Sequence, residues 1–101
     1  MSAPMDPTLR MRLFWTRFAV DEATGCWSWT GYVKPDGYGH VEWPGTVSPH
    51  RVAYMLVKGP VPHGLVIDHL CRNRRCANPA HLEAVTQSTN VSRGYAARRA
   101  A

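Results

Sequence analysis

Most side chains of this sequence that could carry out chemistry lie in one short stretch. Asp68 and His69 are adjacent, and Cys71, Cys76 and His81 follow, with four residues between one of these three ligands and the next. A carboxylate beside an imidazole can act in proton transfer or bind a hard cation, whereas thiolates and imidazoles bind zinc. The stretch therefore predicts an acid–base site directly next to most of a metal site.

The second group of this stretch has the composition of a structural zinc site, which takes four Cys or His ligands and no water. Cys71, Cys76 and His81 supply three ligands from one loop, and Cys26 is the one other cysteine of the three in the chain. With Cys26 the set is complete, and such a zinc contributes on the order of 10 kcal/mol to folding. The alternative is that the thiols are free and buried, with His81 at a strand edge. Four protein ligands leave no position for a reactive water, which argues against a zinc hydrolase or deaminase.

The first group follows a short apolar run, Leu65–Ile67, which predicts a buried strand. His69 has a neutral nitrogen near physiological pH and can take a proton from water. Asp68 suits a hydrated Mg²⁺ or Mn²⁺, and Asn90 offers an amide oxygen for the same ion. Neighbours on a regular strand point to opposite faces, so Asp68 and His69 serve one site only if the strand ends, twists or bulges there. The alternative makes Asp68 a cap or surface charge and His69 a core histidine.

The N-terminal part predicts a helix followed by a β-hairpin. Asp6 can cap a helix with Pro7 at its first position. The expected buried face of this helix consists of Leu9, Leu13, Phe14 and Phe18. Residues Cys26–Thr30 alternate in the manner of a strand, and the turn Pro35–Gly37 predicts that Tyr38–Trp43 returns as its partner. The tryptophans are expected to fill the core.

A second helix is predicted over His50–Lys58, opened by Pro49 and ended by Gly59. Arg51 lies in its first turn. There it is equally suited to face a phosphate and to cover the surface.

The C-terminal part predicts a second strand over Leu82–Val85 and a last helix that carries Asn90. Thr86 or Ser88 can cap this helix. From Val66 onward the order is therefore strand, long loop, strand, helix.

The size and charge of the chain limit the class of protein to which it can belong. We expect its 101 residues to form one α+β domain, residues 1–101. A chain this short often needs a metal to be stable. We expect neither a secretory signal nor a membrane span, hence a reducing cytoplasm where Cys and His bind metal. The net charge of +5 favours a polyanionic partner such as nucleic acid.

Several motifs together resemble the HNH endonucleases of the ββα-metal superfamily. They are Asp68-His69, NPAHLE from Asn78, and TQSTN ending at Asn90. The run H-x-C-x4-C-x4-H from His69 to His81 is also similar to the His-Cys box of homing endonucleases. Sequences around Cys26 (GCWSWTG), Asp36 (DGYG) and His50 (HRVAY) are similar to small HNH proteins of phages and their hosts. The resemblance covers residues 25–93.

This resemblance implies a fold and a reaction. It implies a ββα-metal core at about residues 64–99, preceded by the N-terminal helix and hairpin and stabilised by a structural zinc. It implies cleavage of DNA assisted by Mg²⁺ or Mn²⁺, with His69 as general base, Asn90 as ligand of the catalytic ion and Asp68 as its second ligand. Asn78 would orient the loop and His69 through backbone hydrogen bonds. The structural zinc would be held by Cys26, Cys71, Cys76 and His81.

Basic side chains near these motifs are candidates for contacts to backbone phosphates, which position a duplex without reading its sequence. They are Arg51, Arg72, Arg74, Arg75, Arg93, Arg98 and Arg99. A solvated surface position is the competing interpretation for each of them.

Two functions remain open at this point. The first is an endonuclease that nicks or cuts DNA in a bacterial host cell, encoded by the host or by a phage and acting as a monomer or homodimer. The second is a zinc-stabilised DNA-binding module without catalysis. The presence of His69 and Asn90 together with Asp68 favours the nuclease, because a module that only binds needs none of them.

Overall fold

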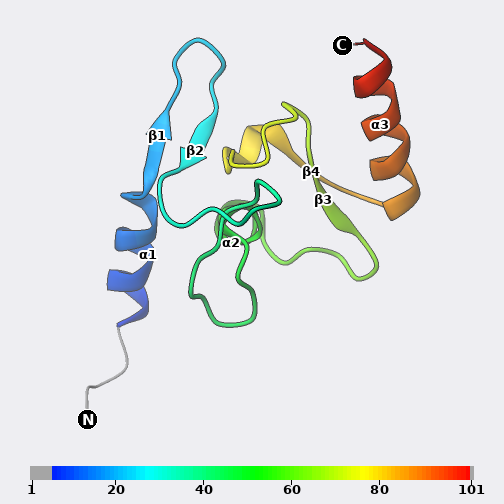
Figure 1. Cartoon of the computed structure of the whole chain (residues 1–101). Coiled ribbons are helices and arrows are strands. Elements are labelled where there is room, and N and C mark those ends of the chain that lie inside the picture. The colour runs from blue at the N-terminus through cyan, green and yellow to red at the C-terminus, as the bar shows by residue number, and fades with distance from the viewer. Residues whose placement is uncertain (1–5, 101) are drawn as a thin grey trace.

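The computed structural model describes residues 6–100 of the chain, and the side chains of residues 6–96. Within this part, three helices and two small antiparallel sheets form an α+β architecture, as the sequence predicts (Figure 1). In chain order, the elements are α1 (Pro7–Trp15), β1 (Phe18–Val20), β2 (Trp27–Trp29), α2 (Pro49–Lys58), β3 (Val66–His69), a 3-10 turn (Pro79–His81), β4 (Leu82–Val85) and α3 (Gln87–Ala100).

Helix α1 begins where its cap signal predicts. The Asp6 carboxylate accepts hydrogen bonds from the backbone N–H groups of Thr8 and Leu9, at 2.7 and 3.4 Å. The predicted buried face is wrong for Leu9 and Leu13, which are 49% and 42% exposed. The helix ends at Trp15, and only Phe14 of its residues is buried.

The predicted partner of the β2 strand is also wrong. Strand β2 pairs with β1 in an antiparallel register that places Phe18 opposite Trp29. Phe18 therefore belongs to a strand and not to the preceding helix. Residues 38–43 form loops with two isolated bridges, Val33 to Gly39 and Trp43 to Thr46, instead of a strand.

The other edge of β2 is occupied by a segment distant in sequence. The backbone N–H of Trp29 donates to Arg75 at 2.9 Å, and that of Ala77 donates to the carbonyl of Trp27 at 2.8 Å. Strand β2 thus lies between β1 and the loop that carries the predicted zinc ligands.

The core joins α1, β2, α2 and this loop. Its buried residues are Phe14, Trp29, Val52, Ala53 and Ala77. Trp29, 1% exposed, lies so close to Gly39 that a Cβ there would approach its ring to 2.6 Å. The prediction that tryptophan fills the core is confirmed for Trp29.

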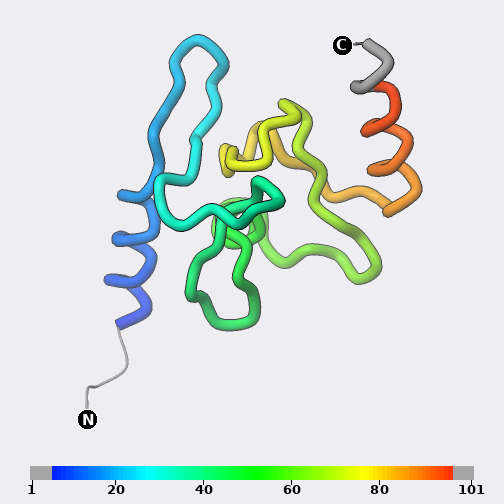
Figure 2. Tube along the Cα trace, viewed as in Figure 1, coloured from blue at the N-terminus to red at the C-terminus, as the bar shows by residue number. Residues whose placement is uncertain are grey.

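The C-terminal part follows the predicted order. Strands β3 and β4 pair antiparallel, with Asp68 opposite Glu83 and His69 opposite Leu82. Thr86 caps α3, since its hydroxyl accepts from the N–H of Thr89 at 3.1 Å. The Cα trace in Figure 2 shows α3 and the β1–β2 hairpin at opposite ends of the molecule, with α2 and the loops between them. Among the described helices, none has the length and apolar character needed to cross a membrane.

Candidate functional site

The four predicted zinc ligands come together in the structure. One ligand atom from each of Cys26, Cys71, Cys76 and His81 lies within 4.8 Å of all the others. The Nδ1 atom of His81 is 3.7 Å from Sγ of Cys26 and 3.5 Å from Sγ of Cys76. Tetrahedral zinc, with bonds of about 2.3 Å to sulfur and 2.0 Å to nitrogen, sets sulfur and nitrogen ligands about 3.5 Å apart. The cluster therefore has the donor set and the spacing that a metal ion requires.

Backbone geometry brings Cys26 to this loop across more than forty residues. Gly25, with φ of +77°, approaches His81 so closely that a Cβ would lie 3.4 Å from its Nε2. The Asn78 side chain donates to the carbonyl of Gly25 at 2.7 Å and accepts from the N–H of Ala80 at 3.0 Å. These contacts fix the end of the hairpin against the 3-10 turn that carries His81.

The thiols differ in their tendency to ionise. A hydrogen bond from the Thr24 hydroxyl is the main cause that lowers the pKa of Cys26 to about 7. Burial raises the pKa of Cys76 to about 12 and also raises that of Cys71. A cation bound among these sulfur atoms would supply the charge that stabilises the thiolate forms of Cys71 and Cys76.

A second site lies at the end of β3, in a cavity of about 700 Å³. It is lined by Tyr38, Ile67, Asp68, His69, Arg72, Arg74, Asn90, Val91, Gly94 and Tyr95. Four predicted site residues besides His69 are in this set, so the structure brings the general-base candidate and both candidate ion ligands to one cavity.

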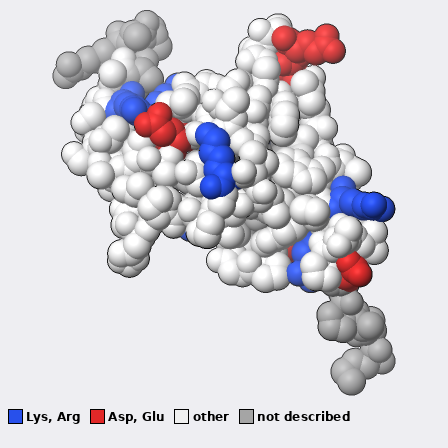
Figure 3. All heavy atoms as spheres, turned by 180° about the vertical axis from the view of Figure 1, so that it is seen from behind, with Lys and Arg blue, Asp and Glu red and all other residues white. Residues whose placement is uncertain are grey.

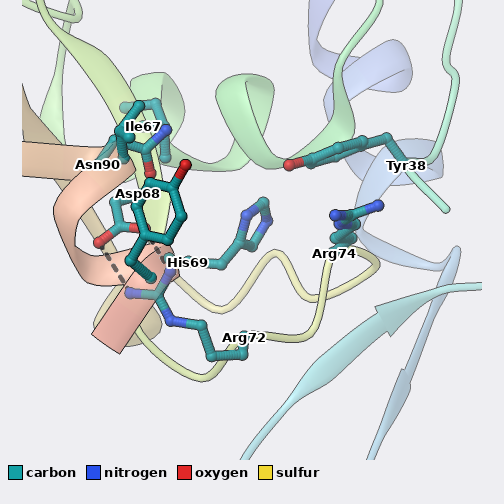
Figure 4. Close-up of a pocket in the computed structure, with 10 residues that line it drawn as sticks. Tyr38, Ile67, Asp68, His69, Arg72, Arg74 and Asn90 are labelled. Carbon is teal, nitrogen blue, oxygen red and sulfur yellow. Dashed lines mark hydrogen bonds and ion pairs between the residues drawn. The ribbon is translucent and has the colours of Figure 1, made fainter. Parts of the chain in front are cut away.

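Figure 4 shows how Asp68 and His69 share this cavity. Their side chains point apart, as those of strand neighbours do, with Asp68 directed toward Arg72 and His69 toward Tyr38. His69 is the last residue of β3, and the chain turns directly after it through a bond from the N–H of Arg72 to the His69 carbonyl. The end of the strand places both side chains along the wall of the cavity.

The Asp68 side chain is 1% exposed and pairs with two guanidinium groups. Arg72 lies 3.2 Å from Oδ1, and Arg93 lies 3.1 Å from Oδ2. Arg93 also reaches Glu83 at 3.3 Å. Asp68 is therefore neither a helix cap nor a surface charge, and both of its oxygen atoms are already paired.

The His69 imidazole is buried, and its Nε2 has no hydrogen-bond partner among the described residues. Burial lowers the pKa of His69, while a hydrogen bond to the backbone of Cys76 opposes this shift. The imidazole is thus held in its neutral form. A buried polar nitrogen without a hydrogen-bond partner lowers the free energy of unfolding by about 1–3 kcal/mol. Such an unpaired group in a native structure calls for an explanation, and a catalytic role is one.

Of the remaining predicted residues, Asn90 lines the cavity, and Asn78 and Arg75 make their contacts elsewhere. Asn78 bonds within the metal loop and to Gly25, and the backbone contact to His69 comes from Cys76. Arg75 donates to the carbonyl of Trp29 at 2.9 Å and so helps to fix the loop on β2.

Of the other predicted arginines, Arg74 lines the cavity and donates to the carbonyl of Asp36 at 2.7 Å. Arg51, in the first turn of α2, is partly buried and is not among the residues that line the cavity. The side chains of Arg98 and Arg99 lie outside the described residues.

Sequence reasoning missed two aromatic neighbours of the site. Tyr38 lines the cavity, and the rings of His50 and His69 have centroids 4.6 Å apart. Burial lowers the pKa of His50 to about 3, so it is neutral at physiological pH. In the sequence, Tyr38 and His50 stand out only as members of the DGYG and HRVAY motifs. These motifs do not indicate that either residue lies beside His69.

Comparison with known proteins agrees with this site. Residues 48–92, which include α2, β3, β4 and the start of α3, match the sequence model of the HNH endonuclease family. This match supports assignment of the segment to the HNH endonuclease family and agrees with the resemblance seen in the sequence.

The curated relatives are phage proteins. Protein 7.7 of Escherichia phage T7 is 42% identical over 66 residues, which is 64% of this chain and 51% of that protein. Protein 2.8 of the same phage is 37% identical over 69 residues, which is 67% of this chain and 48% of that protein. The chain thus spans about half the length of these relatives. No solved structure gives a significant match.

Proposed function

We propose that this chain is a metal-dependent DNA endonuclease in which His69 is the general base. The observation that carries the proposal is the neutral, buried His69 imidazole with an unpartnered Nε2, in the same cavity as Asp68 and Asn90. The family match over residues 48–92 supports it. We take β3, β4 and α3, at about residues 64–99, as the ββα-metal core of the family.

In this proposal, His69 accepts a proton from the water that attacks the phosphorus. The lowered pKa keeps the ring neutral, which is the form that a general base needs before the reaction starts. The bond to the Cys76 backbone fixes the ring and leaves Nε2, which is buried and has no partner among the described residues, as the nitrogen that would accept the proton. A base of this kind contributes about 10²- to 10⁴-fold to the rate.

Asp68 and Asn90 are the residues that would hold the catalytic ion. Both line the cavity and both offer oxygen atoms, the donors that Mg²⁺ and Mn²⁺ prefer. When bound, the ion would neutralise charge on the phosphate and on the departing 3′ oxygen. Because both Asp68 oxygen atoms are paired with arginines, an ion bound to Asp68 would share the carboxylate with Arg72 and Arg93 or displace one of them.

Substrate binding is assigned to arginines close to the cavity. The side chains of Arg72 and Arg93 are 37% and 35% exposed, and Arg74 lines the same cavity. On the face shown in Figure 3, Lys and Arg of the described residues are scattered, and some of them lie beside acidic residues. We propose that DNA binds over the cavity and that the phosphate contacts are made there.

The structural cation is proposed to be zinc. The Cys3His donor set is one of the common zinc sets, and its four protein ligands close the coordination shell. In this proposal, zinc fixes the loop whose Cys76 backbone holds His69, and it takes no part in the reaction.

A plasmid assay tests the function. Zinc-loaded protein with Mg²⁺ or Mn²⁺ is expected to convert supercoiled plasmid to nicked or linear DNA. His69→Ala is expected to lower the rate about 10²- to 10⁴-fold while zinc content and the unfolding midpoint change little. Equal rates for the two proteins would remove His69 as the base.

One observation favours a second candidate, a zinc-stabilised module that binds DNA without cutting it. The two guanidinium groups on Asp68 occupy the oxygen atoms that an ion would need. DNA binding without cleavage, equal in the wild-type protein and in His69→Ala, would support this module.

A further inference from the structure

The His69 ring lies in a cluster of three aromatic side chains. Tyr38, His50 and His69 form mutual contacts, with centroid separations of 5.9 Å from Tyr38 to each histidine and 4.6 Å between the histidines. They come from three parts of the chain: the loop after β2, the first turn of α2 and the end of β3. We call them the ring cluster.

The ring cluster has a firm outer support. The Arg74 guanidinium lies 5.3 Å from the centroid of Tyr38 and donates to the carbonyl of Asp36 at 2.7 Å. The Asp36 carboxylate accepts from the N–H of Tyr38 at 3.0 Å. Tyr38 is thus fixed on one face by a cation and at its backbone by a turn.

His69 needs such support because the ring torsion of histidine is broad and roughly two-fold. No group in residues 6–96 is a partner of its Nε2 that could fix the ring. The Cys76 backbone holds one nitrogen, and tilted contacts with His50 and Tyr38, at interplanar angles of 52° and 47°, limit rotation about the remaining torsion.

We propose that His50 and Tyr38 are positioning residues, which hold the His69 imidazole in the one orientation that directs Nδ1 to the Cys76 backbone and leaves Nε2 as the nitrogen that accepts the proton. This inference rests on the proposed function for its kinetic consequence, but its geometric part stands by itself. His50 suits the role because it is neutral at physiological pH and adds no charge beside His69.

Kinetics and NMR test the inference together. His50→Ala and Tyr38→Leu are expected to lower kcat about 10- to 100-fold with KM nearly unchanged, since misplacement of a reacting group acts on the chemical step. Tyr38→Phe keeps the ring and is expected to recover most of the loss caused by Tyr38→Leu. His40→Ala is the control, because His40 contacts Tyr32 and Glu42 and does not line the cavity.

The NMR measurement does not depend on activity. Long-range ¹H–¹⁵N spectra of the imidazoles are expected to show one tautomer for His69 in the wild-type protein, with the proton on Nδ1, and averaged tautomers in His50→Ala and Tyr38→Leu. An unchanged His69 spectrum and unchanged kcat in both variants would overturn the inference. A wild-type protein that shows the single tautomer but no nicking would overturn the proposed function and leave the ring cluster in place. If His50→Ala does not fold, Tyr38→Leu decides, because Tyr38 is only partly buried.

Discussion

The carboxylate of Asp68 either binds a catalytic ion or organises two arginines, and one substitution separates these roles. Asp68→Asn keeps the shape and one acceptor oxygen but removes the charge shared by Arg72 and Arg93. We expect a loss of about 1–3 kcal/mol in the free energy of unfolding, because charge-assisted hydrogen bonds to a buried group are weakened.

The same variant is tested for Mn²⁺ binding by calorimetry on zinc-loaded protein. If Asp68 is an ion ligand, Asp68→Asn weakens Mn²⁺ binding as well as stability. Glu83→Gln is the control, since Glu83 is an exposed partner of Arg93 alone. Unchanged Mn²⁺ affinity in Asp68→Asn would contradict the ligand role and leave Asp68 as the residue that orients the arginines.

His50 gives the protein a specific sensitivity to acid. Burial, with smaller effects from the charges of His69, Arg51 and Lys34, lowers the folded-state pKa of His50 to about 3 from an ordinary value of 6.5. The unfolded chain therefore binds the proton more tightly, and the stability contributed by neutral His50 is lost as the pH falls below about 6.5 toward 3. Between pH 7 and pH 5 this effect amounts to about 2 kcal/mol.

Denaturant unfolding at several pH values measures this effect. His50→Gln cannot titrate, so its stability is expected to decline less steeply between pH 7 and pH 5 than that of the wild-type protein. His63→Gln, at an exposed position, controls for the loss of a histidine elsewhere. Parallel pH dependences for wild type and His50→Gln would contradict the prediction.

At the scale of elements, the cap of α3 affects the site because this helix carries Asn90 and Arg93. The Thr86 hydroxyl accepts from the N–H of Thr89, and the Thr86 carbonyl accepts from that of Asn90 at 3.0 Å. Thr86→Ala is expected to cost about 1 kcal/mol and to increase amide exchange in the first turn of α3. Thr86→Ser keeps the hydroxyl and is expected to retain protection. Equal amide exchange in Thr86→Ala and in the wild-type protein would show that packing alone stabilises the N-terminal end of α3.

Elements with local start signals were predictable from the sequence, and pairings between distant segments were not. Asp6, Pro49 and Thr86 mark the starts of the three helices through capping and proline geometry. Strand β1 was missed because Phe18 continues the helical spacing from Phe14, and only its tertiary pairing with Trp29 makes it a strand.

In the site, too, some features were predictable from the sequence and others depend on tertiary structure. The Cys3His cluster was predictable, because ligand chemistry and the count of cysteines limit the choices to Cys26 and one loop. The ring cluster was not predictable, since 30 residues lie between Tyr38 and His69 and no spacing rule relates the two. The pairing of Asp68 with Arg93 likewise depends on how α3 crosses β3, which is a tertiary property.

At the scale of the whole molecule, the Cys3His cluster joins the two halves of the chain. The structure is elongated, with principal extents of 52 × 32 × 25 Å, and its core contains few fully buried residues. Cys26 comes from the end of the hairpin and the other ligands from the loop between β3 and β4. A cation at this position would therefore stabilise the contact between β2 and the loop, on which the Cys76–His69 contact depends.

Removal of zinc should consequently affect folding before it affects chemistry. We expect about one zinc per chain by elemental analysis, and a contribution to the free energy of unfolding on the order of 10 kcal/mol. Cys71→Ala or strong chelation is then expected to unfold the chain, seen as loss of chemical-shift dispersion and of the unfolding transition, whereas His63→Ala retains zinc and stability. A folded Cys71→Ala protein that had lost only nicking would mean that the Cys3His cluster serves the reaction directly, and that the structural and catalytic roles assigned to the two sites must be exchanged.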